Sequence, residues 1–136
     1  MLHLPFGHTV TLIIITVAIS LLAFSNQTVM NRLIFWPPAM QRGQFDRFIT
    51  HGFVHADGTH LLFNMITLFF FGNIIESFYR EFFYDMGFVL FYLGGLIFAI
   101  LPSYLKHKND VRWASLGASG AVSAVLFAYI LFQPWN

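Results

Sequence analysis

The distribution of hydrophobic and polar positions divides the chain into four long apolar stretches. They cover about residues 9–24, 59–75, 87–105 and 117–133. A helix needs roughly 17–25 residues to cross a bilayer, and only a helix satisfies the backbone groups of an isolated segment in lipid. The pattern therefore predicts an all-α, polytopic membrane protein with four spanning helices, the first of them at the short end of the range.

The connections between these stretches differ in length and composition. Residues 25–58 form a long first loop, whereas residues 76–86 and 106–116 form short ones. The long loop carries Trp36, Phe45, Phe48 and Phe53 among arginines and prolines, a mixture typical of segments in the membrane interface. We expect an irregular loop lying in that interface, and an ordinary extramembrane loop is the alternative.

Composition supports the membrane class and excludes several others. Of the 136 residues, 57% are hydrophobic and 10% are charged, against roughly 25% charged in a soluble domain. The net charge of +1 gives no sign of a nucleic-acid partner, and the absence of cysteine excludes disulfides and thiolate chemistry. The length allows one domain, which we assign to residues 1–136.

The second apolar stretch carries a polar stripe. His60, Asn64 and Thr67 lie at spacings that place them on one helix face. Polar groups of this kind form helix-packing hydrogen bonds in membrane bundles, or they act as donors toward a reacting oxygen. The stripe by itself does not decide between the two interpretations.

The fourth apolar stretch combines a face of small residues with a serine. The small residues are Gly117, Gly120, Ala121, Ala124 and Ala128. Such a face lets helices approach closely in lipid. Ser119 points to nearly the opposite face in the first turn, where free N–H groups and the helix dipole favour an oxyanion. The alternative is that Ser119 is an N-terminal cap.

Taken in order, these motifs resemble those of a known family. The segment 51–64, HGFVHADGTHLLFN, and Gly117-Ala118-Ser119-Gly120 closely resemble the histidine–asparagine and GxSG motifs of the rhomboid intramembrane serine proteases. Arg47 resembles the arginine of the family's first-loop motif, although Asp46 stands where tryptophan is usual, and Glu76 follows Gly72 as in the family's second helix. The resemblance covers about residues 45–133.

The resemblance implies a six-helix core of which this chain holds the first four helices. Ser119 would be the nucleophile, and His60, Asn64 and the Ser119 backbone N–H would form the oxyanion hole. The general base would be a histidine on the sixth helix, outside this sequence, so we expect the 136-residue piece alone to be inactive. The reaction would be peptide-bond hydrolysis in transmembrane protein substrates within the lipid bilayer, without metal or cofactor, in a multi-pass protein of the bacterial plasma membrane.

Two other functions remain open. A catalytically inactive rhomboid-like pseudoprotease would bind membrane clients through the same cavity. A metal-binding membrane protein would use His51, His55 and His60, although closed zinc sites usually have four ligands.

Two sequence signals disagree on the orientation of the chain in the membrane. Six of the seven basic residues lie on the side of the first and third loops, at positions 32, 42, 47, 106, 108 and 112. The positive-inside rule places that side in the cytoplasm, whereas the resemblance places the first loop outside. We follow the resemblance.

Overall fold

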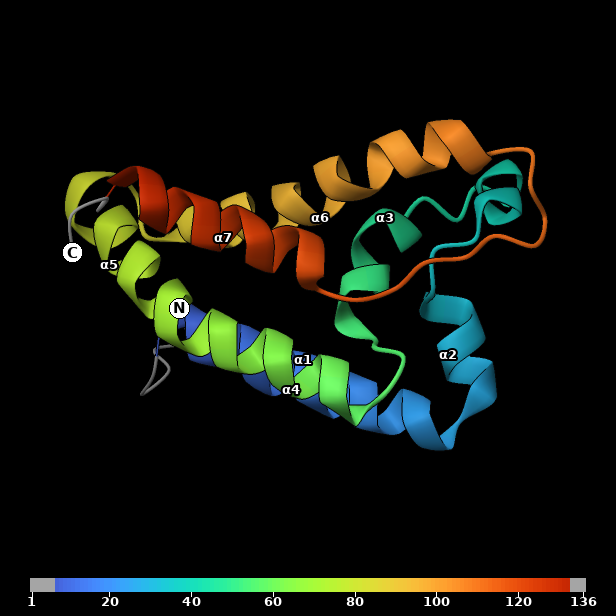
Figure 1. Ribbon diagram of the computed structural model, residues 1–136, viewed down its shortest axis with the longest axis horizontal. Helices are drawn as coiled ribbons and strands as arrows, with labels where there is room; N and C mark the ends of the chain where they lie inside the picture. The colour runs from blue at the N-terminus through green and yellow to red at the C-terminus, as the bar shows by residue number, and fades with distance from the viewer. Residues whose placement is uncertain (1–6, 133–136) are drawn as a thin grey trace.

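The computed structural model describes residues 7–132, and these fold as a bundle of helices. The elements are α1 (His8–Ser25), α2 (Gln27–Leu33), η1 (Pro37–Arg42), α3 (Arg47–Thr50), η2 (His51–Phe53), α4 (Gly58–Thr67), η3 (Leu68–Gly72), α5 (Asn73–Phe82), α6 (Met86–His107) and α7 (Ser119–Phe132). Figure 1 shows α1 beside α4 and α6 beside α7. Within the described part of the chain there is no strand, and β pairing is limited to an isolated bridge between Phe35 and Ser115.

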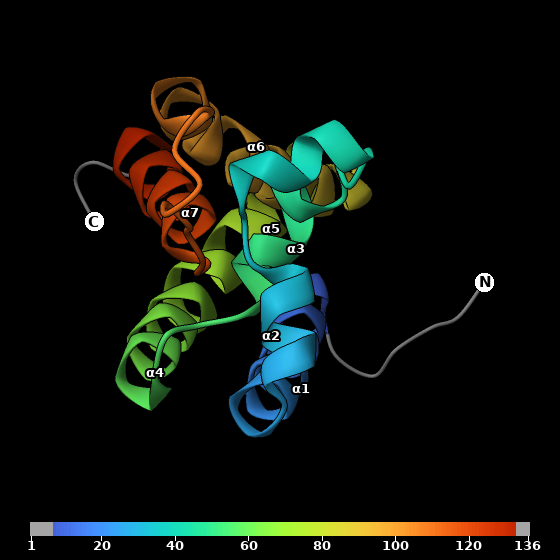
Figure 2. The same ribbon diagram turned by 90° about the vertical axis from the view of Figure 1, so that its right-hand side faces the viewer.

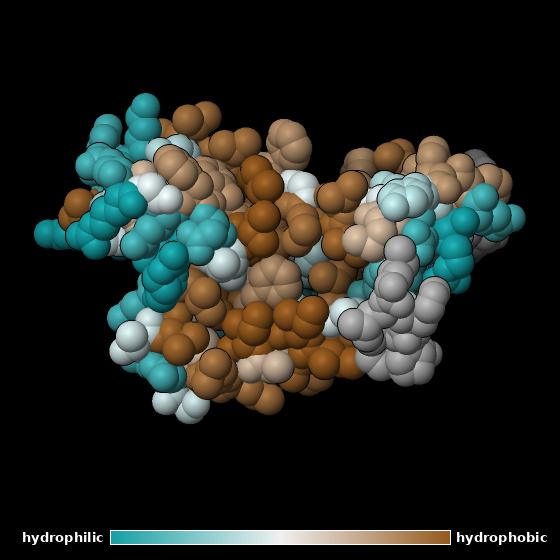
Figure 3. All heavy atoms as spheres, turned by 180° about the vertical axis from the view of Figure 1, so that it is seen from behind, coloured by the Kyte–Doolittle hydropathy of each residue, from teal (hydrophilic) through white to brown (hydrophobic). Residues whose placement is uncertain are grey.

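Three helical spans are long and apolar enough to cross a membrane: His8–Ser25, Gly58–Phe82 and Met86–His107. On the face shown in Figure 3, apolar residues cover the middle of the molecule and hydrophilic residues gather toward its two ends. The all-helical, multi-pass membrane class is therefore confirmed. The fourth helix, α7, has 14 residues in the described region and is shorter than a span, so a fourth crossing stays a prediction, and Gln133 lies outside the described residues.

The second span is longer than the apolar stretch that predicted it. The helix continues from residue 75 through Phe82 because the charged residues that follow the apolar run are good helix formers. A π-helical segment, Leu68–Gly72, interrupts its regular pitch. There the absence of a side chain at Gly72 allows close approach to α1, since a Cβ would lie 2.7 Å from a Thr9 methyl carbon.

Glu76 joins this helix to the start of α1. Its carboxylate accepts hydrogen bonds from the backbone N–H groups of His8 at 2.7 Å and Thr9 at 2.9 Å, and from the Thr9 hydroxyl at 2.7 Å. Free N–H groups at a helix N-terminus need partners, and a carboxylate there is also favoured by the helix dipole. The buried Glu76 therefore stabilises the packing of α5 against α1.

Small residues set the spacing of α6 and α7. A Cβ at Gly120 would collide with the Cβ of Ala99, and one at Gly95 would lie 3.2 Å from the Ala121 Cα. The small face predicted from the sequence is therefore the face that packs on α6, and close approach of backbones is the way membrane helices gain packing energy.

The first loop is more regular than predicted. It contains two short α-helices and two 3₁₀ turns, and it covers one end of the bundle (Figure 2). The Phe35 ring packs edge-on against Phe48 and Tyr104, with centroids 5.0 and 5.7 Å away. The buried Arg47 donates to the carbonyl oxygens of Asn31 at 3.0 Å and Ile34 at 2.8 Å. These contacts satisfy the turn backbone and make the loop a rigid support.

Candidate active site

The segment before α7 determines where Ser119 lies. Gly117 has a φ of +112°, a conformation open to glycine and strained for other residues, and it ends the extended segment so that the helix begins at Ser119. Helix formation thus starts two residues later than the apolar pattern predicted. The Gly117 N–H donates to the His51 carbonyl at 2.8 Å, which fixes the turn against the first loop.

Ser119 shares a cavity of about 230 Å³ with His60 and Asn64. The wall also includes Phe63 from α4 and Gly117. The structure therefore brings together the three residues selected from the sequence, from helices separated by more than fifty positions.

The Ser119 backbone N–H is available to donate a hydrogen bond to a bound group. Among residues 7–132, no acceptor binds the Ser119 N–H, and the Ser119 hydroxyl makes no hydrogen bond. The side chain is exposed to the cavity. A capping serine would instead accept a bond from an N–H in the first turn, so the described structure gives the capping interpretation no support.

His60 is held by an acidic neighbour that the sequence interpretation did not use. Asp57 caps α4 by accepting from the His60 N–H at 2.9 Å, and the same oxygen lies 2.8 Å from the ring Nδ1. A carboxylate accepts hydrogen bonds, so Nδ1 carries the proton. These two bonds lower the pKa of the Asp57 carboxyl below its usual value, and the bond from the His60 backbone N–H has the larger effect. His60 then donates from Nε2 only as the imidazolium.

The other two residues of the predicted polar stripe, Asn64 and Thr67, differ in their surroundings. Asn64 lines the cavity. The Thr67 hydroxyl donates to the Phe63 carbonyl of its own helix at 2.9 Å, so it takes no part in the cavity. One turn of helix therefore separates a cavity residue from a residue with a purely local hydrogen bond.

Two histidines assigned to the loop reach the same region. His51 and Ser119 both line a second hollow, of about 160 Å³, and the His51 Nε2 pairs with the Leu96 carbonyl at 3.2 Å. The His55 Nε2 accepts from the Ala118 N–H at 3.2 Å. Together with His60 these two histidines were candidate metal ligands, but the two rings have different partners. Within the described residues, no group of three His, Cys, Asp or Glu side chains could hold a metal.

The start of α7 lies well below the end of α6. Gly120 packs against Ala99, eight residues before α6 ends at His107, which corresponds to about 12 Å along a helix. The segment after α6 therefore returns into the bundle before α7 begins. Ser119, next to Gly120, therefore lies near the level of Ala99 in α6 and not at the level of the helix end.

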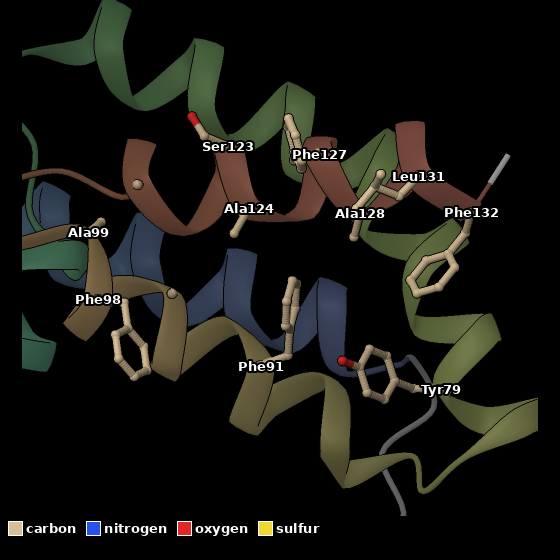
Figure 4. A pocket seen from close by; sticks show the side chains of 12 residues that line it. Tyr79, Phe91, Phe98, Ala99, Ser123, Ala124, Phe127, Ala128, Leu131 and Phe132 are labelled. Atoms are coloured by element: carbon tan, nitrogen blue, oxygen red, sulfur yellow. The ribbon is translucent and has the colours of Figure 1, made fainter. Parts of the chain in front are cut away.

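A larger apolar groove runs along α6 and α7, next to the small residues at which these two helices meet. It encloses about 640 Å³. Phe91 and Phe98 from α6, Tyr79 from α5 and Phe127 from α7 line it (Figure 4). Ser123 is also among its lining residues. Apart from such groups the groove is apolar, as expected for a surface in contact with lipid or another helix.

Comparison with known proteins places these features in a family. Residues 42–136 match the rhomboid domain family. The chain is 30% identical over 122 residues to RHOMBOID-like protein 12, mitochondrial, of Arabidopsis thaliana, covering 82% of this chain and 36% of that protein. It is 30% identical over 124 residues to the rhomboid protease GlpG of Enterobacter sp. (strain 638), covering 90% and 41%.

A third relative is the putative rhomboid protease YdcA of Bacillus subtilis (strain 168), 32% identical over 88 residues, with 65% of this chain and 41% of that protein covered. The chain thus spans between about a third and two fifths of the length of these relatives. The family match covers more than half of the chain and includes both sequence motifs, and on this evidence the chain belongs to the rhomboid family.

Proposed function

We propose that this chain carries the nucleophile and the oxyanion-stabilising groups of an intramembrane serine protease. The observation that supports the proposal most directly is the shared cavity of Ser119, His60 and Asn64, together with the Ser119 N–H, which has no acceptor among residues 7–132. Its relatives include rhomboid proteases. The substrates would be transmembrane proteins that reach the cavity from the surrounding bilayer.

In the proposed reaction the Ser119 hydroxyl oxygen attacks the scissile carbonyl carbon while a base removes its proton. The carbonyl oxygen becomes an oxyanion, which the Ser119 N–H, the Asn64 amide and the His60 Nε2–H stabilise. The same base, now protonated, gives its proton to the leaving amine, and water later releases the acyl group by the reverse sequence. The cavity provides the route by which water reaches a site beneath the surface.

We propose that the base is a histidine outside this sequence, on the sixth helix of the core. His51 and His55 have both been placed in other hydrogen bonds. The groove along α6 and α7 offers an apolar face for such a helix, and two of the relatives, from Arabidopsis thaliana and Enterobacter sp. (strain 638), are more than twice as long as this chain. The bacterial plasma membrane remains a prediction, because the relatives come from bacteria and from a plant mitochondrion.

The test is cleavage of a transmembrane substrate by the full-length protein in detergent or vesicles. Ser119→Ala should abolish cleavage and labelling by a serine-reactive phosphonate. Ser123→Ala, which changes a hydroxyl one helical turn away, should retain both. Wild-type activity in Ser119→Ala would eliminate the mechanism.

The pseudoprotease alternative predicts a different outcome. Wild-type protein would then bind transmembrane segments without cleaving them, and the phosphonate would not label Ser119. Binding without labelling in the full-length protein would favour this alternative.

A further inference from the structure

The backbone leading to Ser119 donates three hydrogen bonds to the first loop. The Ser115 N–H donates to the Phe35 carbonyl at 2.9 Å, and the Gly117 N–H donates to the His51 carbonyl at 2.8 Å. The Ala118 N–H donates to the His55 Nε2 at 3.2 Å. The first two contacts join backbone to backbone. The third depends on one side chain and involves the residue directly before the nucleophile.

The His55 ring connects this segment to α1. Its Nδ1 lies 3.1 Å from the Ser20 hydroxyl oxygen, and that hydroxyl donates its proton to the Phe53 carbonyl at 2.8 Å. Ser20 therefore accepts from Nδ1, so the proton of the ring lies on Nδ1 and the lone pair on Nε2. Only this neutral form can accept from the Ala118 N–H.

The surroundings of His55 favour that form. The ring is 1% exposed, and burial lowers its pKa to about 4, with His60 nearby adding to the effect and Asp57 opposing it. A protonated ring would present an N–H to the Ala118 N–H, and two donors would face each other.

Ala118 requires an anchor because its neighbour provides little restraint. Gly117 lacks a Cβ, so the peptide that joins it to Ala118 rotates more freely than other peptides. Occupation of the Ala118 N–H sets the plane of this peptide, and the next backbone donor, the Ser119 N–H, has no acceptor among residues 7–132. A rotation here would move both the Ser119 hydroxyl and the oxyanion donor.

We propose that His55 is a positioning residue for the nucleophile, which transmits the position of α1 through Ser20 to the Ala118 backbone and so to Ser119. This rests on the function proposed for Ser119. His55 lines the cavity of Ser119, but both of its ring nitrogens are engaged in hydrogen bonds within the protein, and the ring acts by fixing the geometry on which proximity effects depend.

The hydrogen-bond part of the proposal is tested on the full-length protein in detergent, by measurements that do not depend on activity. Nitrogen-15 NMR of the ring should show a neutral His55 with the proton on Nδ1 between pH 6 and 8, and the Ala118 amide should exchange slowly with solvent. In Ser20→Ala the Ala118 exchange should accelerate, whereas Ser25→Ala, an exposed hydroxyl at the end of the same helix, should have no effect. A proton on Nε2 would overturn the proposal.

The kinetic part uses the full-length protein. His55→Ala should lower kcat by about 10- to 100-fold, within the range expected for a misplaced reacting group, with KM changed by less than about twofold. His55→Gln retains an acceptor for the Ala118 N–H and should recover part of kcat. His107→Ala, which removes a ring stacked on Trp113 away from the cavity, should leave kcat unchanged.

The outcomes separate this proposal from the proposed function. Activity in Ser119→Ala would refute the function itself. If Ser119 is required but His55→Ala keeps its kcat, only the positioning role is refuted. Should His55→Ala fail to fold, Ser20→Ala decides in its place: a kcat about 3- to 10-fold below that of Ser25→Ala supports the role, in line with the loss of one buried hydrogen bond, and an equal kcat overturns it.

Discussion

Asp57 binds both the backbone and the ring of His60 through one carboxylate oxygen, at 2.9 and 2.8 Å. The bond to the backbone is an N-cap, which begins α4, and the bond to the ring fixes the tautomer of a cavity residue. One side chain therefore starts the helix and occupies Nδ1 of His60, which leaves Nε2 as the ring nitrogen without a hydrogen bond among residues 7–132. Asp57→Asn separates the two effects because asparagine caps helices as well as aspartate does.

We expect Asp57→Asn to keep the fold and to lower cleavage by roughly tenfold, because a charge-assisted hydrogen bond to the imidazolium becomes a neutral one. The comparison is Asp110→Asn, which changes an exposed carboxylate that caps a turn in the third loop. Cleavage rates and thermal unfolding are measured for both variants. An unchanged rate in Asp57→Asn would show that the charge on His60 is not needed.

His60→Ala distinguishes an oxyanion donor from a base. Loss of one oxyanion donor costs about 10²–10³ in rate, so residual cleavage should remain measurable. If His60→Ala is as inactive as Ser119→Ala in the full-length protein, His60 would instead be the base, and our assignment of that role to a residue outside this sequence would be wrong.

Asn64 and Thr67 provide a matched pair on one helix. Asn64→Ala should lower cleavage by about 10²–10³ through the loss of an oxyanion donor. Thr67→Ala should change it little, because the Thr67 hydroxyl bonds the Phe63 carbonyl of its own helix. The measurement is the initial rate of cleavage of one transmembrane substrate by each variant. Equal effects of the two changes would argue against a specific role for Asn64.

Gly120 and Gly94 test the close packing of α6 against α7. A methyl group at Gly120 would collide with Ala99, whereas one at Gly94 meets nothing within 4 Å. Gly120→Ala should therefore destabilise the bundle by about 1–3 kcal/mol, as overpacking does. Gly94→Ala should be neutral or slightly stabilising, because alanine favours a helix. Unfolding in mixed detergent gives both values, and equal stabilities would contradict the packing described.

The stability of the fold should depend on pH through His55. The pKa of His55 is about 4 in the fold, against an ordinary value of 6.5, so the unfolded chain binds a proton at higher pH than the folded one. The stabilising effect of the neutral ring is complete above about pH 6.5 and is lost as the pH falls toward 4. Thermal unfolding between pH 7.5 and 5 should show a steeper loss for wild type than for His55→Gln. Parallel curves would show that another group controls the loss.

The family, the helical class and the cavity residues could be predicted because their signals are local. Ser119, His60 and Asn64 were recognised from two short motifs, and the chain's membership of the rhomboid family confirms that resemblance. The catalytic roles themselves remain predictions. The end of the second span could not be found in this way, because apolar periodicity ceases at residue 75 while the helix continues to Phe82.

The sequence by itself determined which segments enter lipid, because each side chain makes its own contribution to transfer from water to the bilayer and these contributions add along a short window. Only the tertiary structure decided the hydrogen bonds of the His55 ring, whose partners Ser20 and Ala118 lie 35 and 63 residues away. It also decided that Asp57 serves His60 as well as a helix end. Such bonds depend on which groups the packing of distant helices brings within about 3 Å, and no local pattern of residues carries that information.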